Sequence, residues 1–264
     1  MTTLKTSQTD GNRKITSGTK EWADYNVNCI NGCYNDCRYC YAKMMSHRFG
    51  RVNRDSWRYM KIRKDMLLKD FKKMPGRVMF PSTHDIIDTP PFKDICFKVL
   101  EKLLKSNNQV LITTKPRLGV IREIDRQFSS FKRQIQFRFT ITSVDNRLLD
   151  FWEPNAPKFE ERLASMKFAF KKGYKTSVSI EPFLDPDPVE LVERVIPYAT
   201  ESIWIGKMNY ISSKNLSRNE KCYYTQVRKN YETNHLRFVC RKLRGNTKIR
   251  FKDSIRNQLG IKAS

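Results

Sequence analysis

The 264-residue sequence has no apolar run near the about 20 residues that a membrane-spanning helix requires. Its first residues contain no apolar segment typical of a secretory signal, so we expect a cytoplasmic protein that does not contact a membrane. Three catalytic motifs are also missing: GxxxxGK(S/T), GxSxG and HExxH. These absences argue against a P-loop nucleotide hydrolase, an α/β-hydrolase and a metalloprotease of the HExxH type.

Acidic residues are scarce, since 27 Asp and Glu stand against 51 Lys and Arg, for a net charge of +24. The excess lies in two blocks, with 12 cations against three acids in residues 43–77 and 14 against three in residues 207–257. Such blocks predict a polyanionic partner, most commonly a nucleic acid, although a solvated lysine-rich surface is an alternative. Aromatic residues make up 12% of the chain, which argues against disorder.

Short runs rich in β-branched and aromatic residues alternate with helical runs. They predict strands over residues 25–29, 77–80, 109–113, 136–141, 176–180 and 202–206. Strands separated by helices indicate a parallel sheet with crossovers, whose catalytic groups lie at the carboxyl ends of the strands. We therefore predict an α/β fold, a partial (β/α)6 TIM-like barrel over residues 21–210. A flexible arm would cover residues 1–20, and a basic C-terminal extension packed on the barrel would cover residues 211–264.

Two stripes of apolar residues at helical spacing predict buried helix faces. The stripes comprise Phe92, Ile95, Val99 and Leu103, and Phe159, Leu163, Met166 and Phe170. Pro90 and Pro91 stand just before the first stripe, and Gly173 stands just past the second, as helix boundaries favour.

Three cysteines, Cys33, Cys37 and Cys40, follow the first predicted strand at the spacing C-x3-C-x2-C. Three thiolates on one loop can bind three irons of a cubane [4Fe-4S] cluster and leave the fourth iron open. Gly32 permits a tight turn before the first ligand. A structural zinc site with Cys29 as fourth ligand, or a chance grouping of buried cysteines, are the alternatives.

Polar residues stand at the ends of three predicted strands. Lys115, Ser143 and Glu181 each follow an apolar run. Because a barrel places its site at the carboxyl ends of its strands, these three are candidate site residues. The alternative for each is a solvent contact or a helix cap.

The cysteine motif, with Tyr39 before its last cysteine, resembles that of the radical S-adenosylmethionine (SAM) superfamily. Further motifs resemble the spore photoproduct lyase-like branch, also described as DNA repair photolyase-like. They lie at residues 25–33, 40–42, 82–85, 112–115, 140–143, 153–157 and 180–182. The resemblance covers about residues 20–210.

The resemblance implies a [4Fe-4S] cluster on Cys33, Cys37 and Cys40, with SAM bound at the open iron. Members of this superfamily cleave SAM reductively, and the resulting 5′-deoxyadenosyl radical abstracts a hydrogen atom from the substrate. The electron would come from a flavodoxin- or ferredoxin-type donor. The cofactor supplies this chemistry, and the protein supplies ligands and orientation.

The resemblance also assigns SAM contacts. Tyr39 would lie beside the adenine, Ser82 and Thr83 beside the methionyl amino group, Lys115 beside the carboxylate, and Thr142 and Ser143 beside the ribose. Glu181 would be a polar partner of cofactor or substrate. His84 lies in the turn after the second predicted strand, next to the candidate site. It is a candidate for proton transfer or for substrate binding. Glu153 and Arg162 are expected to form a structural ion pair near a helix start.

The sequence departs from the branch at one position. Spore photoproduct lyases carry a hydrogen-donating cysteine close to the turn after the second strand, where this chain has Ser82. The O–H bond of a hydroxyl is too strong for that task, so we do not expect repair of thymine spore lesions. Cys96 is expected to pack as a small hydrophobe, and Cys222 and Cys240 are too far apart in sequence to suggest a second cluster.

The basic blocks contain aromatic residues. Phe49, Trp57 and Tyr59 lie in the first block, and the second holds Tyr210, Tyr223, Tyr224 and Tyr231. Because guanidinium groups pair with phosphates and rings stack on bases, this mixture predicts single-stranded or locally opened nucleic acid as substrate, in modification or repair. Two alternatives are a radical SAM enzyme acting on a peptide, protein or small molecule, and a non-catalytic metal-containing nucleic-acid-binding protein.

Overall fold

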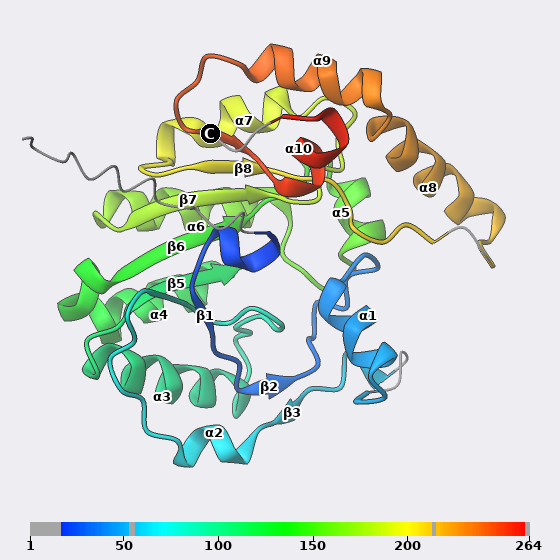
Figure 1. Cartoon of the computed structure of the whole chain (residues 1–264). Helices are drawn as coiled ribbons and strands as arrows, with labels where there is room; N and C mark the ends of the chain where they lie inside the picture. The colour runs from blue at the N-terminus through cyan, green and yellow to red at the C-terminus, as the bar shows by residue number, and fades with distance from the viewer. Residues whose placement is uncertain (1–16, 53–55, 213–214, 262–264) are drawn as a thin grey trace, which may run out of the picture.

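The computed structural model describes residues 17–52, 56–212 and 215–261. Its main sheet has seven strands in the order β1-β4-β5-β6-β7-β8-β9, and all neighbours are parallel (Figure 1). The strands are β1 Tyr25–Asn26, β4 Arg77–Met79, β5 Gln109–Thr114, β6 Ile135–Thr140, β7 Lys175–Ile180, β8 Ile203–Ile205 and β9 Ile249–Phe251. They curl into a half-barrel with β1 and β9 at its edges, which confirms the predicted partial TIM-like barrel.

Two strands of the main sheet differ from the sequence prediction by more than one residue at an end, and the small sheet formed by β2 (Ile30–Asn31) and β3 (Lys61–Ile62) was not predicted. The seventh strand, β9, comes from residues 249–251 and pairs with β8, although the sequence predicted six strands. Its three residues are too short a run to stand out among basic neighbours. β1 ends at Asn26 rather than at residue 29, because the side chain of Asn28 turns to bind the loop after β4.

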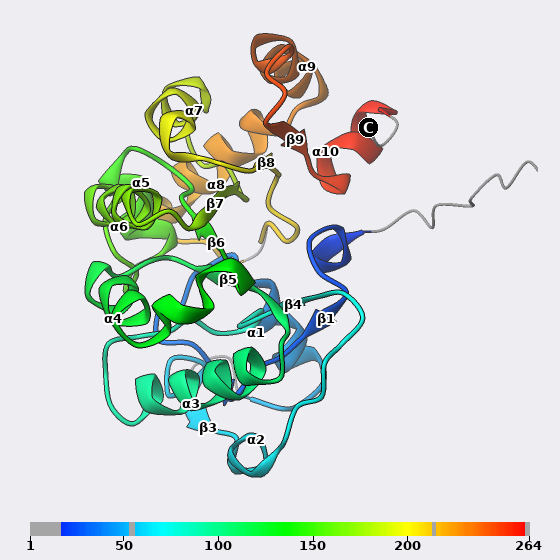
Figure 2. The same cartoon turned by 90° about the vertical axis from the view of Figure 1, so that its left-hand side faces the viewer.

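The described helices are α1 Tyr41–Arg48, α2 Lys64–Leu68, α3 Phe92–Lys105, α4 Leu118–Phe128, α5 Asn146–Trp152, α6 Phe159–Lys171, α7 Val189–Val195, α8 Arg218–Asn230, α9 Thr233–Leu243 and α10 Asp253–Leu259. Helices α3, α4, α6 and α7 cover the outer face of the sheet, and α1 and α8 lie toward the carboxyl ends of the strands (Figures 1 and 2). Short 3-10 helices lie at η1 Gly18–Glu21, η3 Ser129–Gln134 and η4 Ile196–Tyr198, and β2 Ile30–Asn31 pairs with β3 Lys61–Ile62. In the described part of the chain, no helix is both long and apolar enough to cross a membrane.

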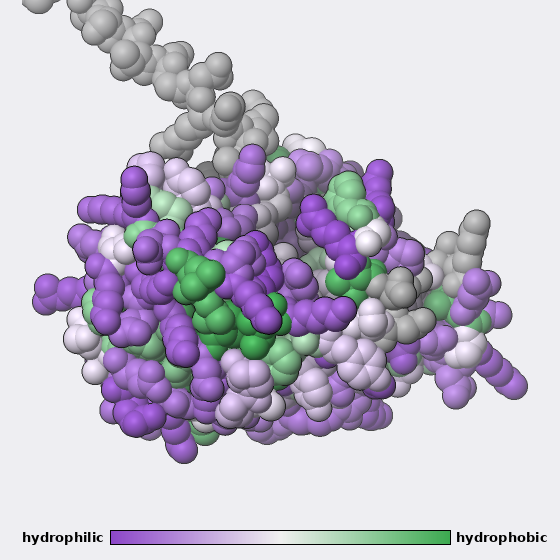
Figure 3. Space-filling model, turned by 90° about the horizontal axis from the view of Figure 1, so that it is seen from below, coloured by the Kyte–Doolittle hydropathy of each residue, from purple (hydrophilic) through white to green (hydrophobic). Residues whose placement is uncertain are grey.

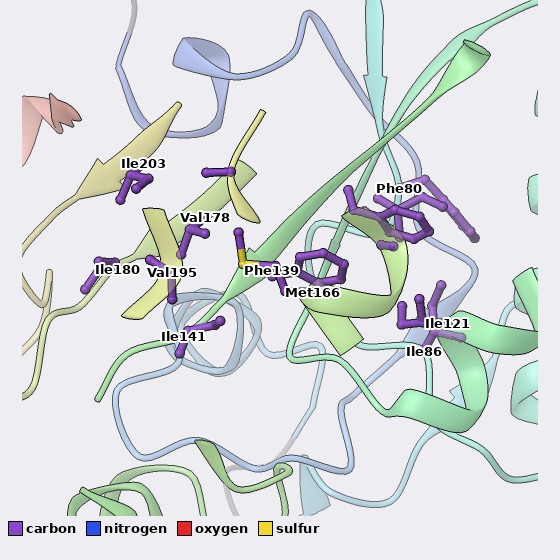
Figure 4. Close-up of a cluster of buried hydrophobic side chains, with 14 of the residues drawn as sticks. Phe80, Ile86, Ile121, Phe139, Ile141, Met166, Val178, Ile180, Val195 and Ile203 are labelled. Carbon is purple, nitrogen blue, oxygen red and sulfur yellow. The ribbon is translucent and has the colours of Figure 1, made fainter. Parts of the chain in front are cut away.

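The main core lies between the sheet and these helices. Figure 4 shows Phe139 and Ile141 beside Met166 of α6 and beside Val178 and Ile180 of β7. Both predicted helical stripes are buried except at their outer members, since Phe92 is half-buried and Phe170 is exposed. Phe170 is 39% exposed, because it lies in the last turn of α6 and meets only the edge of Tyr198.

The inner face of the half-barrel is polar in its middle. Arg138 of β6 is 2% exposed, and its Nε donates to Ser177 Oγ of β7 at 3.1 Å. Its guanidinium carbon lies 4.5 Å from the ring centre of Trp22 and 5.6 Å from that of Trp204. Trp22 also packs on a second small apolar cluster that includes Leu111, so the segment before β1 occupies the inside of the curve.

That N-terminal segment is bonded to the residues after β9. Asp253 accepts from the backbone N–H of Gly18 at 3.1 Å, and Lys252 donates to the Gly18 carbonyl at 2.7 Å. Glu21 forms ion pairs with Lys252 and, at 2.8 Å, with Arg256. Residues 1–16 of the arm predicted over residues 1–20 lie outside the described residues, whereas its last residues lie in η1.

Candidate active site

The three cysteines lie on a loop between β2 and α1, at the carboxyl edge of the sheet. Gly32 opens this loop with φ +89°, and a Cβ there would lie 2.5 Å from the carbonyl oxygen of Trp57. The same carbonyl accepts from the N–H of Cys33 at 2.9 Å. Only glycine allows this close approach together with this φ, so the sequence Gly32-Cys33 anchors the loop.

Cys33 and Cys37 are buried, and Cys40 caps the N-terminus of α1. Burial raises the pKa of the Cys33 thiol to about 12 and raises the pKa values of Cys37 and Cys40 as well. The charge of Lys115 lowers all three pKa values, and the charge of Cys40 raises the other two. The three thiols and the ammonium therefore lie within electrostatic reach of one another.

Cys29 belongs to a different cluster. Its Sγ lies 3.8 Å from His84 Nε2 and 3.7 Å from Cys96 Sγ, and all three residues are buried. Among the described residues, no group of three His, Cys, Asp or Glu side chains could hold a metal ion. The geometry therefore gives no support to a structural zinc site with Cys29 as the fourth ligand.

His84 lies in the loop after β4, where both of its ring nitrogens face backbone groups. Nε2 accepts from the N–H of Cys29 at 3.1 Å, and Nδ1 lies 3.1 Å from the carbonyl of Asp85. These contacts assign the proton to Nδ1. In this arrangement the imidazole fixes the loop to residue 29, and its catalytic role stays a prediction.

Ser82 and Thr83 are held by Asn28, which the sequence analysis did not single out. Both backbone N–H groups donate to Asn28 Oδ1, at 2.8 and 2.9 Å. Asn28 Nδ2 donates to Ser82 Oγ at 2.9 Å, whereas Thr83 is exposed. One amide thus sets the conformation of the turn that follows β4.

Glu153 joins several of the predicted cofactor residues. Its Oε1 accepts from the hydroxyls of Tyr39 and Thr142, the latter at 2.7 Å, and lies 3.8 Å from Lys115 Nζ. Its Oε2 forms the expected ion pair with Arg162, and neither side chain is exposed. Burial alone would raise the pKa of Glu153, but these two cations lower it below its usual range. The carboxylate therefore stays ionised.

Lys115 follows the last residue of β5 and lies beside Tyr39, with Nζ 5.5 Å from the ring centre. Burial disfavours its charge, but the negative charges of Cys37 and Glu153 raise its pKa above the usual range. Lys115 is therefore a cation fixed between the cysteine loop and the carboxylate. The structure brings Tyr39, Thr142 and Lys115 together through Glu153.

Ser143 follows Thr142 but points to another acid. Its hydroxyl donates to Asp185, which also accepts from the N–H of Val144 at 3.2 Å. Burial raises the pKa of Asp185 to about 6. Asp185 was not among the predicted site residues, because nothing in the sequence distinguishes it from the other acids in its proline-rich loop.

Glu181 follows β7 and is half-buried. A Cβ on Gly206 would lie 2.8 Å from Glu181 Cγ, so the glycine makes room for this side chain. Burial raises the pKa of Glu181 to about 7, and the charge of Lys252 opposes that rise. In the described part of the chain its carboxylate has no hydrogen bond or ion pair, which leaves it available to a ligand.

Asp85 links the cysteine loop to β5. It is 4% exposed and accepts from Asn35 Nδ2 at 2.6 Å, from the N–H of Lys115 at 3.0 Å and from Thr114 Oγ1 at 2.5 Å. Asn35 in turn accepts from Arg117 Nη2 at 2.8 Å. These contacts hold residue 35 of the loop against the end of β5.

Aromatic side chains are exposed around this site. Tyr34, Tyr41, Phe49 and Tyr59 are 48, 53, 59 and 60% exposed. Tyr41 stacks on Tyr210 at a ring-centre distance of 6.2 Å. A cavity of about 670 Å³ near the end of β8 is lined in part by Lys207 and Tyr231.

Of four other predicted stacking residues, three are buried inside the protein and one is half-buried against another ring. Trp57, Tyr224 and Tyr231 are buried, and Tyr223 stacks on Phe151 at 3.9 Å. These rings fill the interfaces that attach the cysteine loop and α8 to the barrel. Of the aromatic residues predicted in the second basic block, Tyr210 alone is an exposed ring.

The family model of the radical SAM superfamily matches residues 27–196, a segment that contains the cysteine loop and β4 to β7. The chain belongs to the radical SAM superfamily. Membership implies a SAM cofactor and an iron–sulfur cluster, consistent with the three thiols beside a fixed cation.

Two curated relatives are similar to this radical SAM chain. The "Uncharacterized protein MJ0683" of Methanocaldococcus jannaschii is 31% identical over 66% of this chain and 65% of its own length. The "Uncharacterized protein ORF301" of Acidianus two-tailed virus is 29% identical over 64% of this chain and 60% of its own length. The aligned segments thus span less than two thirds of each relative.

Solved structures with some similarity include a spore photoproduct lyase variant with bound AdoMet and dinucleoside spore photoproduct. It has a TM-score of 0.49 and 17% identity over 84% of this chain and 67% of that one. Streptococcus suis SuiB bound to the precursor peptide SuiA has a TM-score of 0.47 and 12% identity, over 70% of this chain and 39% of that one.

The residues of this radical SAM chain fit a cubane cluster. Each thiolate would bind a different iron, so the three sulfurs need not converge on one point, as a single metal ion would require. Backbone N–H groups at residues 35, 42 and 43 favour the thiolates of Cys33 and Cys40 by lowering their pKa values. Donors of this kind stabilise thiolate ligands and tune the potential of a bound cluster.

Proposed function

We propose that this protein is a radical SAM enzyme of the spore photoproduct lyase-like branch that modifies or repairs nucleic acid. Cys33, Cys37 and Cys40 would hold a [4Fe-4S] cluster with one open iron for SAM. Bound together, the two cofactors supply reductive cleavage of SAM and abstraction of a hydrogen atom from a C–H bond. A flavodoxin- or ferredoxin-type protein would supply the electron.

The chain's own residues orient the cofactor in this proposal. Lys115 offers the cation for the SAM carboxylate, and Glu153 keeps it charged and in place. Tyr39 would lie beside the adenine, with its hydroxyl fixed by the same carboxylate. Ser82 and Thr83, on the turn set by Asn28, are assigned to the methionyl amino group.

The remaining predicted residues take the ribose and the substrate. Thr142 and Ser143 would bind the ribose. Thr142 would do so through the lone pairs of its hydroxyl, and Ser143 through the one lone pair that is left, because its Oγ already accepts from the N–H of Asp145 at 2.8 Å. Glu181 would bind the substrate, since its half-buried carboxylate has no partner within the described residues. His84 would support the turn next to residue 82, and a direct proton transfer by it would require one ring nitrogen to be released.

The observation that carries the nucleic-acid substrate is the set of exposed rings beside the cysteine loop. Arg58 lies 4.9 Å from the ring centre of Tyr59, and Arg51 lies 5.5 Å from that of Phe49. Exposed rings with guanidinium groups beside them can stack unpaired bases and pair with phosphates. A substrate held there would lie at the edge of the sheet where the cofactors bind.

Anaerobic reconstitution with iron and sulfide, followed by SAM and dithionite, tests the cofactor assignment. We expect a 5′-deoxyadenosine product, and its loss in the triple variant Cys33→Ala, Cys37→Ala and Cys40→Ala. Cys222→Ala is the matched control, because this exposed thiol lies outside the loop. Iron incorporation without any SAM cleavage would contradict the enzyme assignment, as would full activity of the triple variant.

The substrate is tested by adding single-stranded DNA, single-stranded RNA or peptide to the same reaction. We expect nucleic acid to bind with a steep salt dependence and to increase 5′-deoxyadenosine formation. The variant Tyr34→Ala with Tyr59→Ala should weaken this binding about tenfold or more, at about 1–3 kcal/mol for each stacked base. Phe170→Ala with Phe238→Ala is the control, since these rings are 39 and 38% exposed elsewhere. Stimulation by peptide alone would overturn the substrate class.

A further inference from the structure

A second cavity lies at the amino ends of the strands, at the edge of the sheet opposite the cysteine loop. It has a volume of about 640 Å³ and reaches from η1 to the first residues of β4, β5, β6 and β7. In Figure 1 the carboxyl ends of these strands point toward the side where α1 lies. Figure 2 is viewed from the opposite side, so the amino ends of the strands face the reader. The cavity is large enough for a ligand of nucleotide size.

Cations dominate the lining of this cavity. They are Lys20, Lys73, Arg77, Arg133 and Lys175. Within the described residues, none of these five side chains has an ion pair or a side-chain hydrogen bond. They come from four segments of the chain, at residues 20, 73–77, 133 and 175. The fold therefore brings together cations without ion pairs that lie up to 155 positions apart in the sequence.

The two acids in the lining are already bound elsewhere. Glu21 forms its ion pairs with Lys252 and Arg256. Asp24 accepts from the backbone N–H of Arg77 at 2.8 Å. Glu21 is thus offset by cations outside the lining, whereas Asp24 keeps its negative charge. The lining therefore carries five cations against one acid without an ion pair, and its net charge is positive.

A further buried cation lies behind the cavity wall. Arg138 packs on Trp22, which lines the cavity, and its Nη1 is buried without a hydrogen-bond partner in the described part of the chain. The positive charge of Arg77 also acts on this guanidinium. Arg138 itself does not line the cavity, but an anion bound in the cavity would offset the repulsion between Arg77 and Arg138.

We propose that this cavity is a binding site for a ligand with several phosphate groups and the size of a nucleoside triphosphate. One phosphate would leave most of the five cations unpaired, whereas a polyphosphate chain can contact cations from several strands at once. A free nucleotide suits the cavity better than a nucleic-acid strand, because the exposed rings that would bind a strand lie at the opposite edge. The site is separate from the cofactor residues.

Direct binding measurements on the full chain test this site without SAM, iron or activity. ATP without metal, inorganic tripolyphosphate and adenosine are titrated by calorimetry at low and moderate salt. We expect ATP and tripolyphosphate to bind, adenosine not to bind, and affinity to fall as salt rises.

The variant Arg133→Gln with Lys175→Gln should weaken ATP binding about tenfold or more, because both side chains are exposed and the fold does not depend on them. The matched control is Lys98→Gln with Lys171→Gln, which removes two exposed cations from α3 and α6 and should leave ATP affinity unchanged. Equal weakening by both variants would show non-specific attraction to a basic protein and overturn the site. The proposal would also be overturned if a short single-stranded oligonucleotide displaced ATP from this site and bound there more tightly than ATP.

Discussion

Replacing Glu153 by Gln tests the central claim about the candidate active site. Gln keeps an oxygen acceptor for the hydroxyls of Tyr39 and Thr142 but removes the charge that offsets Lys115 and Arg162. The side chains of these two cations are 14 and 0% exposed. Breaking a buried ion pair by removing one partner costs about 3–5 kcal/mol, because a charge is left uncompensated in the interior. We therefore expect the free energy of unfolding to fall by that amount at pH 7.

The pH dependence gives a second measure of the same effect. The folded pKa of Glu153 lies below its usual range, so its contribution to stability is present above the unfolded pKa of about 4.3 and is lost as pH falls through the folded pKa. The difference between the wild-type protein and Glu153→Gln should therefore be largest near neutral pH and shrink below about pH 4.

Urea denaturation followed by circular dichroism measures both quantities. The matched control is Glu190→Gln, which removes an exposed partner of Arg194 at 3.8 Å and should change stability by at most about 0.5 kcal/mol. The reasoning would be refuted if the two variants lost equal free energy of unfolding, or if the loss from Glu153→Gln did not vary with pH. Either result would mean that Glu153 is not an ionised carboxylate that stabilises the buried cations around it.

Two further predictions concern other parts of the site. Glu181→Gln should be more stable than the wild-type protein by on the order of 2 kcal/mol at pH 8. Because the folded pKa is raised to about 7, wild-type stability is lost as pH rises toward that value. Urea midpoints at pH 5 and pH 8 check this, with Glu201→Gln as control, and an advantage of equal size at both values would contradict it. Gly32→Ala should lower the iron content and the melting temperature, because its Cβ would meet the carbonyl of Trp57 at 2.5 Å. Gly245→Ala is the control, because Gly245 has φ +98° but an added Cβ would have no atom within 4 Å. This variant therefore measures the backbone strain without a clash. If both variants lowered the melting temperature equally, the clash would not be the cause.

The sequence was sufficient to predict the parallel sheet and the position of the cysteine loop, because both depend on local signals. Alternating apolar runs identify strands and helices, and the cysteine spacing is confined to eight residues. The face shown in Figure 3 is mainly hydrophilic with small apolar patches, in agreement with the high content of charged residues.

Long-range polar contacts could not be predicted in the same way. Glu153 and Arg162 were correctly expected to pair, but the bonds from Glu153 to Tyr39 and Lys115 span 114 and 38 positions and leave no periodic signal. Asn28 and Asp185 were missed for the same reason. An aromatic side chain can stack on a ligand only if it is exposed, and exposure cannot be predicted from the residue type alone. Trp57 was therefore assigned to the surface although it is 3% exposed.

The bonds between η1 and residues 252–256 have a consequence for how the molecule is made. They join positions 234 and 235 apart in sequence, near the two unpaired edges of the curved sheet. A nascent chain that has emerged only as far as β8 has neither β9 nor the lysine and arginine that hold Glu21. A cluster inserted during synthesis would therefore bind to a barrel in which η1 is not yet bonded to residues 252–256. Contacts between residues this distant in sequence form late and slowly in folding. Closure of the barrel, and maturation of a bound cluster with it, should follow the emergence of residues 249–256.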